Sequence, residues 1–317
     1  MARQRSNSRL ATDWKMRTAW VESSSGGIKI LAAARCCSPI ASKDIFHIGL
    51  VTVGLMDMKN SNADSPQRML PAPPLPANDS RWALFLDVDG TLLDFNDDPR
   101  AVEVTAPLLA LLHSLHNALG GALALVSGRE LDDLDRLFGN PHWAAAGLHG
   151  LQLRRADGSF RRITVTPEQQ QHMLQAATAL ATRFEGVQLE DKRIAVALHC
   201  RRVPEQFGSL RDAAVQMVTQ LPGYELQPGN LVIEFKPAGM DKGRAVLELL
   251  ASAPFNGRLP VYLGDDLTDE HAFASLRQKH GMGVLIGSPH SSTQASFSLR
   301  DPAAVKTWLV RVLDALS

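Results

Sequence analysis

The sequence has few cysteines, no excess of either charge and no long apolar segment. The three cysteines are an odd, sparse set that does not resemble a disulfide framework, so we expect a reducing, cytoplasmic compartment. Lys plus Arg and Asp plus Glu both number 33, which argues against a nucleic-acid or membrane-surface partner. The longest apolar candidate, residues 45–56, is shorter than the roughly 20 residues that a membrane span needs. We expect a monomer, and the 317 residues suffice for one large or two ordinary domains.

The first part of the chain differs from the rest in composition. Within residues 1–79, residues 1–59 are basic and serine-containing and show no clear apolar period, and the proline-rich stretch PAPPLPANDS follows at 71–80. This pattern predicts a disordered extension that ends in a linker. Two alternatives stay open, namely an organelle transit peptide and a true start of translation at Met56 or Met58.

Strand-like and helix-like segments alternate in residues 80–150 and again in residues 239–317. The expected strands lie at 81–89, 121–129, 142–150, 259–266 and 281–287, and the expected helices at 106–119, 130–139, 241–252 and 268–278. This alternation predicts an α/β core with a doubly wound parallel sheet.

Residues 151–238 interrupt that alternation. Hairpin patterns surround Asp157-Gly158 and Pro228-Gly229, and helices are expected at about 167–185 and 204–220. We interpret this stretch as a smaller α+β domain with an antiparallel sheet, inserted into the core as a cap.

Unusual polar side chains occur at four places where a predicted strand ends or a predicted helix begins. They are Asp87 with Asp89, Ser127 with Gly128 and Arg129, Lys242, and Asp265 with Asp266. Because ligands of open α/β sheets bind outside the carboxyl ends of the strands, these groups should meet at one edge. Each alone is also typical of a turn, a helix cap or a solvated side chain. Their combination in this order favours a site.

The residue types indicate phosphoryl transfer. Converging carboxylates repel one another unless a cation compensates, and all-oxygen ligands favour a hard cation such as Mg²⁺. A hydroxyl group and a lysine beside Mg²⁺ are typical of a phosphoryl-transfer site. Asp87 would attack phosphorus to form an aspartyl-phosphate. Asp89 would protonate the leaving oxygen and later deprotonate the hydrolytic water.

Four motifs resemble those of the haloacid-dehalogenase-like phosphatases. They are DVDGT at 87–91, VSGR at 126–129, Lys242 in DKG, and GDDLTDE at 264–270, and the resemblance covers 81–149 and 239–312. It implies the nucleophile Asp87 and the acid/base Asp89, which also argues against halide chemistry. The phosphate ligands that it implies are Thr91, Ser127, Gly128, Arg129 and Lys242. The Mg²⁺ ligands that it implies are Asp87, the Asp89 carbonyl and Asp265, with support from Asp266 and Asp269.

The inserted region carries a second resemblance. GLHG at 147–150, EDK at 190–192, HCR at 199–201 and IEFKPAGMDKG at 233–243 are similar to the trehalose-6-phosphate phosphatase family, over about residues 81–310. This implies trehalose 6-phosphate as the small-molecule substrate. The sugar contacts that it implies are His149, Glu190, Lys192, His199, Arg201 and Glu234. Asn230 departs from the pattern, because a lysine is expected four residues before Glu234.

Other functions stay open. The chain could hydrolyse another sugar phosphate, such as sucrose phosphate or mannosylphosphoglycerate, or act as a non-catalytic sugar-phosphate sensor. A phosphomutase is a further alternative, although its cap would have to hold a bisphosphate. The intact set of Asp87, Asp89, Lys242 and Asp265 argues against the sensor.

Overall fold

The structure, a computed structural model, describes residues 70–77, 81–94, 102–229, 231–289 and 293–317, and two short strands nearer the start of the chain. The chain divides into two units, Met1–Asn62 and Ala63–Ser317. In the first unit, β1 (Trp20–Glu22) pairs antiparallel with β2 (Ile28–Ile30). The rest of the predicted extension up to residue 69, with both candidate start methionines, lies outside the described residues. No helix in the described part of the chain is long and apolar enough to cross a membrane.

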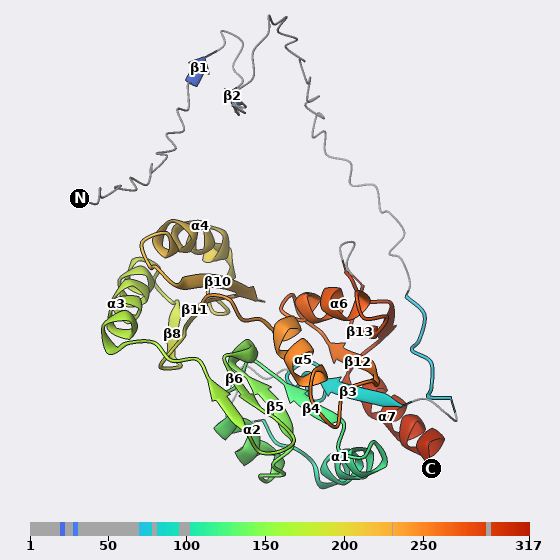
Figure 1. The fold of residues 1–317 in the computed structure, drawn as a ribbon. Helices are drawn as coiled ribbons and strands as arrows, with labels where there is room; N and C mark the ends of the chain where they lie inside the picture. The colour runs from blue at the N-terminus through green and yellow to red at the C-terminus, as the bar shows by residue number, and fades with distance from the viewer. Residues whose placement is uncertain are drawn as a thin grey trace, which may run out of the picture. The chain divides into compact units, whose positions relative to one another are not determined.

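The larger sheet of the second unit has eight strands within the described residues, in the order β14-β13-β12-β3-β4-β5-β6-β7 (Figure 1). The strands are β3 (Trp82–Leu86), β4 (Leu123–Val126), β5 (Ala144–Gly147), β6 (Gln152–Arg154), β7 (Phe160–Arg162), β12 (Leu259–Gly264), β13 (Met282–Ile286) and β14 (Phe297–Leu299). Neighbours from β14 to β5 are parallel. Strands β3, β4 and β5 are buried along their whole lengths, as their uninterrupted apolar sequences predict for a sheet covered on both faces.

Helices cover this sheet from two sides. They are α1 (Ala106–Ala118), α2 (Leu131–Phe138), α5 (Lys242–Leu250), α6 (Glu270–Arg277) and α7 (Pro302–Leu316). Helix α1 packs against α7, and α5 packs against α6 on the other side of the sheet (Figure 1). Helix α2 ends at Gly139, whose φ of 72° is the left-handed conformation expected of a closing glycine. The prediction of a doubly wound α/β core is confirmed.

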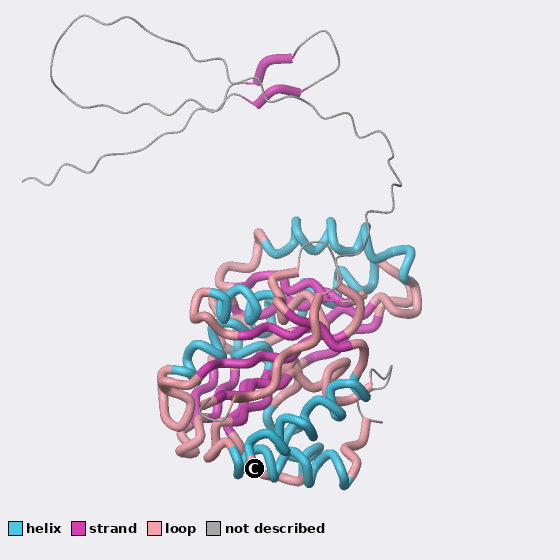
Figure 2. Tube along the Cα trace, turned by 90° about the vertical axis from the view of Figure 1, so that its right-hand side faces the viewer, coloured by secondary structure: helices cyan, strands magenta, loops and turns pink. Residues whose placement is uncertain are grey.

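The smaller sheet is antiparallel, with four strands in the order β10-β11-β9-β8 among the described residues. They are β8 (Gln188–Asp191), β9 (Val196–His199), β10 (Tyr224–Gly229) and β11 (Val232–Pro237). Helices α3 (Pro167–Arg183) and α4 (Phe207–Val218) pack on one face of this sheet (Figure 2). This face is apolar, and Leu198 and Phe235 are buried there. Both predicted helices of the inserted region are confirmed.

The first hairpin of that region belongs to the other sheet. Strands β6 and β7 form around Asp157-Gly158 as expected, but β6 pairs antiparallel with β5 of the larger sheet. Leu153 is buried opposite Ala146, so the apolar face of the hairpin continues the core. The assignment of this hairpin to the smaller sheet is therefore wrong. The division of the rest of 151–238 from the core stays a prediction.

The proline-rich segment 70–77 is a packed part of the second unit. Pro71 O accepts a hydrogen bond of 3.0 Å from Ser298 N, and Pro73 O accepts one of 3.3 Å from the buried indole of Trp308. Leu70 and Leu75 pack against the larger core. The prediction of a linker over these residues is wrong, because the segment buries apolar side chains and satisfies an indole N–H that would otherwise be unpaired.

Candidate active site

Asp87 lies at the switch point of the larger sheet. Strand β3 has β4 on one side and β12 on the other, so chain connections leave it in opposite directions and open a crevice at its carboxyl end. Asp87 follows β3 directly, is 4 % exposed, and donates its amide to Leu263 O of β12 at 3.0 Å. The buried apolar strand thus carries a carboxylate into the interior. Burial raises the pKa of Asp87 well above its ordinary range, and Lys242 opposes this effect.

Lys242 provides the compensating charge. It is the first residue of α5, which Asp241 caps by accepting the Arg244 amide at 2.8 Å. Its Nζ donates to Asp87 Oδ1 at 2.8 Å and to Asp269 Oδ1 at 2.7 Å, and its side chain is 3 % exposed. Burial lowers the pKa of Lys242, but Asp269 and Asp87 outweigh burial and hold it well above its ordinary value. The alternative of a solvated helix lysine is wrong.

Asp269 is fully buried, and four donors saturate it. Oδ1 accepts from Lys242 and from the Tyr262 hydroxyl at 2.5 Å. Oδ2 accepts from the amides of Asp265 at 3.0 Å and Asp266 at 3.1 Å. Asp269 therefore fixes the loop after β12. Tyr262 is missing from the sequence prediction, although a tyrosine inside an apolar strand needs a partner for its hydroxyl and so indicates a nearby acceptor.

The carboxylates of Asp87, Asp265 and Asp269 each place an oxygen within 4.8 Å of the other two. Because Asp269 is saturated, Asp87 and Asp265 are the two that each keep an oxygen without a hydrogen bond from the described residues. Gly90 makes room for Asp265, since a Cβ there would lie 2.1 Å from Asp265 Oδ2, and its φ is 84°. Burial and the charges of Asp269 and Asp266 raise the pKa of Asp265 to about 7. A divalent cation would relieve this repulsion, so the oxygen set fits a metal.

Asp266 closes the same loop. Its Oδ1 accepts from the amide and hydroxyl of Thr268 at 2.8 and 2.6 Å and from the Asp269 amide at 3.2 Å. Burial opposes ionisation, but Lys242, at 3.8 Å, and these hydrogen bonds lower the pKa of Asp266 to about 2. These contacts fit a supporting position beside the metal ligands.

Asp89 and Arg129 form a bidentate ion pair. Arg129 Nε donates to Oδ2 at 2.7 Å and its Nη2 to Oδ1 at 2.5 Å. Ser127 is buried after β4 and accepts the Arg129 amide at 3.1 Å; the cap residue of α2 is Glu130, so the alternative of a Ser127 helix cap is not observed. Thr91 donates to Asp265 at 3.2 Å. Two predicted phosphate ligands therefore contact carboxylates in this structure, Thr91 that of Asp265 and Arg129 that of Asp89.

The polar face of the smaller sheet carries several of the residues that are predicted to contact the sugar. Ala197 of β9 stands opposite Glu190 of β8 and Glu234 of β11, so both glutamates share the face that α3 and α4 leave uncovered. His199, two residues along β9, hydrogen-bonds Glu190 Oε2 through Nε2 at 2.9 Å. This hydrogen bond is the main cause that lowers the pKa of Glu190 to about 2. Arg201 lies in the turn after β9, and Asn230 lies outside the described residues.

Lys192 and His149 connect this face to the core. Lys192 Nζ donates to Glu234 Oε2 at 3.0 Å and to Gly128 O at 3.4 Å. His149 Nε2 lies 3.8 Å from Glu234 Oε2, and its ring lies so close to Gly128 that a Cβ there would stand 2.9 Å away. Burial lowers the pKa of His149 to about 4, so the imidazole is neutral at neutral pH.

Two buried atoms of this group lack partners. Among the described residues, neither His149 Nδ1 nor Glu234 Oε1 has a hydrogen bond. A buried polar atom without a partner costs about 1 to 3 kcal/mol, so the pair is suited to receive ligand groups.

Comparison with known proteins agrees with this geometry. A family model described as trehalose-phosphatase matches residues 85–303. The chain is 39% identical over 226 residues to a probable trehalose-phosphate phosphatase of Sinorhizobium fredii, covering 71% of this chain and 85% of the relative. It is 38% identical over 242 residues to the trehalose-6-phosphate phosphatase of Escherichia coli, covering 76% and 90%. The chain belongs to the trehalose-phosphatase family.

A solved structure supports the fold. The C-terminal domain of C. albicans trehalose-6-phosphate phosphatase superposes with a TM-score of 0.67 at 22% identity, covering 75% of this chain and 94% of that one. This likeness confirms the predicted fold. Haloacid-dehalogenase-like phosphatases generally use a divalent metal, and the aspartate cluster of this chain could bind one.

Proposed function

We propose that the chain is a Mg²⁺-dependent phosphatase that hydrolyses trehalose 6-phosphate to trehalose and phosphate. The observation that carries this proposal is the buried Asp87 carboxylate, which Lys242 holds beside Asp265 at the switch point of the sheet. The two bacterial relatives, both described as phosphatases of trehalose phosphate, support the substrate. The all-oxygen donor set supports Mg²⁺.

In the first half of the reaction, Asp87 attacks the phosphorus atom. A bond forms between its carboxylate oxygen and phosphorus, the bond from phosphorus to the sugar oxygen breaks, and Asp89 gives that oxygen a proton. Lys242, the Ser127 hydroxyl and the Gly128 amide stabilise the phosphoryl oxygens. Asp87 and Asp265 would hold a divalent cation, which would supply further positive charge for the phosphoryl group.

In the second half, Asp89 takes a proton from water as the water attacks phosphorus, which releases phosphate and restores Asp87. The Arg129 fork occupies both oxygens of Asp89. Each of these oxygens keeps a second lone pair, through which Asp89 meets the leaving oxygen or the water. Asp269 and Tyr262 keep Lys242 and the loop after β12 in place throughout the reaction.

The polar face of the smaller sheet holds the sugar. Glu234 Oε1 and His149 Nδ1 bind hydroxyl groups and thereby gain the partners that they lack. Glu190, Lys192, His199 and Arg201 add charged and polar contacts on the same side. In this proposal residues 80–150 and 239–317 form the catalytic core, the hairpin and segment 70–77 join it, and the rest of 151–238 is the cap of a cytoplasmic monomer.

Phosphate release from a panel of substrates tests the proposal. The panel contains trehalose 6-phosphate, sucrose phosphate, mannosylphosphoglycerate and glucose 6-phosphate, each with Mg²⁺ and with a chelator. We expect the highest kcat/KM for trehalose 6-phosphate and no turnover with the chelator. A higher kcat/KM for another sugar phosphate would mean that this compound is the substrate and would leave the proposed chemistry unchanged. No turnover of any compound in the panel would favour the non-catalytic sensor.

A further inference from the structure

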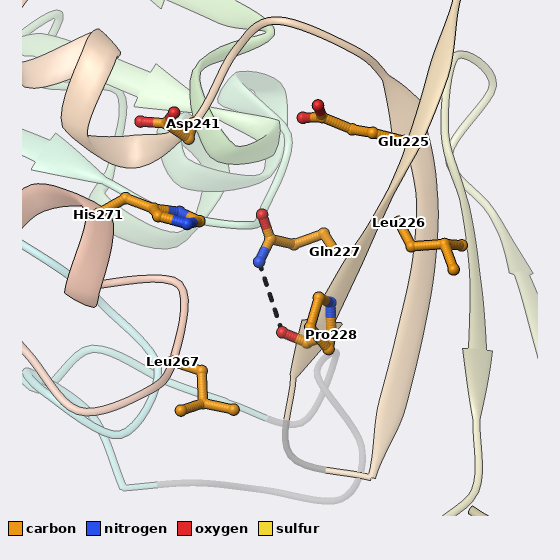
Figure 3. Close-up of a pocket in the computed structure, with 7 residues that line it drawn as sticks. All are labelled: Glu225, Leu226, Gln227, Pro228, Asp241, Leu267 and His271. Atoms are coloured by element: carbon orange, nitrogen blue, oxygen red, sulfur yellow. Dashed lines mark hydrogen bonds between the residues drawn. The ribbon is translucent and has the colours of Figure 1, made fainter. Parts of the chain in front are cut away.

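A cavity of about 300 Å³ lies between the smaller sheet and the helices of the larger one (Figure 3). Gln227 of β10 lines it from one side, and Asp241, Leu267 and His271 line it from the other. Its volume is at the small end of the range of ligand pockets. None of these four residues belongs to the site predicted from the sequence.

Gln227 is the buried polar group of this cavity. It is 6 % exposed, yet its Nε2 makes a single long hydrogen bond of 3.4 Å, to Pro228 O. Its Oε1 accepts no hydrogen bond from the described residues. Figure 3 shows the amide directed into the space between His271, Asp241 and Pro228. A buried amide with most of its capacity unused is suited to a ligand that both donates and accepts hydrogen bonds.

The cavity borders the candidate active site on both sides. Gln227 stands directly opposite Glu234 in the register of β10 and β11, so the two side chains share the polar face of the smaller sheet. On the other side, Asp241 immediately precedes Lys242, and Leu267 follows Asp265 by two residues. A molecule that extends from the phosphate site past Glu234 would therefore reach this cavity.

The charges of the cavity wall indicate a neutral ligand. Glu225 is paired with Lys236 at 2.5 Å, and Asp241 accepts the Arg244 amide at 2.8 Å, so neither carboxylate needs a cation. The same carboxylates would repel an anion. Leu267 is 52 % exposed at the rim and offers an apolar surface to the C–H face of a sugar ring. Amide, carboxylate and apolar groups together fit a polyhydroxylated, uncharged ring.

We propose that this cavity is a second sugar subsite, in which Gln227 binds hydroxyl groups of the hexose ring remote from the phosphate. The inference rests on the proposed function, because it assigns a place to the second ring of a disaccharide phosphate. Gln227 is then a specificity-determining residue that distinguishes disaccharide phosphates from monosaccharide phosphates.

The test compares Gln227→Met and Leu267→Ala with the wild-type enzyme on three substrates. Methionine keeps the length of the side chain and removes its hydrogen bonds. Because Leu267 is exposed, its replacement leaves the fold unaffected. We expect each variant to lower kcat/KM for trehalose 6-phosphate about 3- to 10-fold, the loss of about one hydrogen bond or ring contact. Turnover of glucose 6-phosphate and p-nitrophenyl phosphate should stay within about twofold, which also shows that the variants are folded.

Gln216→Met serves as the matched control, since Gln216 is exposed on α4 behind the opposite face of the sheet. It should match the wild type on all three substrates. Two outcomes would overturn the subsite alone, provided that the wild type hydrolyses trehalose 6-phosphate. In one, Gln227→Met and Leu267→Ala keep the wild-type kcat/KM. In the other, they lower kcat/KM equally for all three substrates. A wild type that does not hydrolyse trehalose 6-phosphate would overturn the proposed function and the subsite with it.

Discussion

Lys242 donates a hydrogen bond of 2.8 Å to Asp87 across a sequence separation of 155 residues. Both side chains are almost completely buried. Separating such a pair would leave an unpaired charge in the interior, so the contact stabilises the crevice at the end of β3. It also keeps the Lys242 ammonium group where phosphate is proposed to bind.

Replacing Lys242 with Met should therefore affect both stability and activity. The variant leaves Asp87 and Asp269 without their ammonium partner, which should lower the free energy of unfolding by about 3 to 5 kcal/mol. It should also lower kcat at least about 100-fold, as the loss of an oxyanion-stabilising group does. Urea unfolding and phosphate release measure the two effects. Lys279→Met, at an exposed position, is the control and should change neither.

Asp89→Asn should separate the two chemical steps. With trehalose 6-phosphate, loss of the acid should lower kcat about 10²- to 10⁴-fold. The leaving group of p-nitrophenyl phosphate needs little proton donation, so the first step should survive and only the attack of water should slow. Rapid mixing should then show a burst of p-nitrophenol equal to the enzyme concentration, followed by slow turnover. Equal losses for both substrates without a burst would contradict the assigned role.

Truncation should locate the start of the folded unit between residues 69 and 80. A chain that begins at residue 70 keeps the contacts of Pro71 with Ser298 and of Pro73 with Trp308. A chain that begins at residue 80 loses them together with the packing of Leu70 and Leu75, which should cost about 2 to 4 kcal/mol. Thermal unfolding of the two chains gives the comparison. Equal melting temperatures would show that segment 70–77 contributes nothing.

His149 should make the protein less stable in mild acid. Burial lowers its pKa from 6.5 to about 4, with Glu234 opposing, so the folded state binds this proton less readily than the unfolded chain does. Its stabilising contribution is complete above pH 6.5 and is lost as the pH falls towards 4, by up to about 3 kcal/mol. His149→Asn removes the titration, and asparagine tolerates the φ of 53° at this position.

The difference in unfolding free energy between the wild type and His149→Asn should therefore shift against the wild type as the pH is lowered from about 7.5 to 4.5. Other titrating groups are common to both proteins and cancel in this difference. A difference that is independent of pH would mean that His149 titrates normally.

The sequence predicts the parallel core because its strands are short apolar runs that end in polar motifs. The run WALFL is buried on both faces, and this pattern alone places Asp87 at a sheet edge. The hairpin of β6 and β7 is predicted as a hairpin, but its sheet depends on the fit of Leu153 against Ala146, which no local pattern encodes. Prolines at 71–76 are equally typical of a free linker and of an extended segment packed on a core.

The same limit applies to the site. The positions of Lys242 and Asp265 follow from motif spacing and strand order. Two contacts do not follow in this way, namely the hydrogen bond from the Tyr262 hydroxyl to Asp269 and the ion pair of Arg129 with Asp89. They depend on how side chains of different helices, strands and loops point toward one another. The cavity beside Gln227 arises where the smaller sheet meets the helices of the larger one, and no local pattern in the sequence predicts that meeting.

The central claim is that the phosphoryl group passes through Asp87. Asp89→Asn should accumulate the intermediate during turnover of p-nitrophenyl phosphate, so this variant is quenched in acid, digested and examined by mass spectrometry. The account predicts one phosphoryl group on the peptide that contains Asp87, and neither adduct nor turnover in Asp87→Asn, which stays folded. Full turnover by Asp87→Asn, or an adduct on another residue, would contradict it.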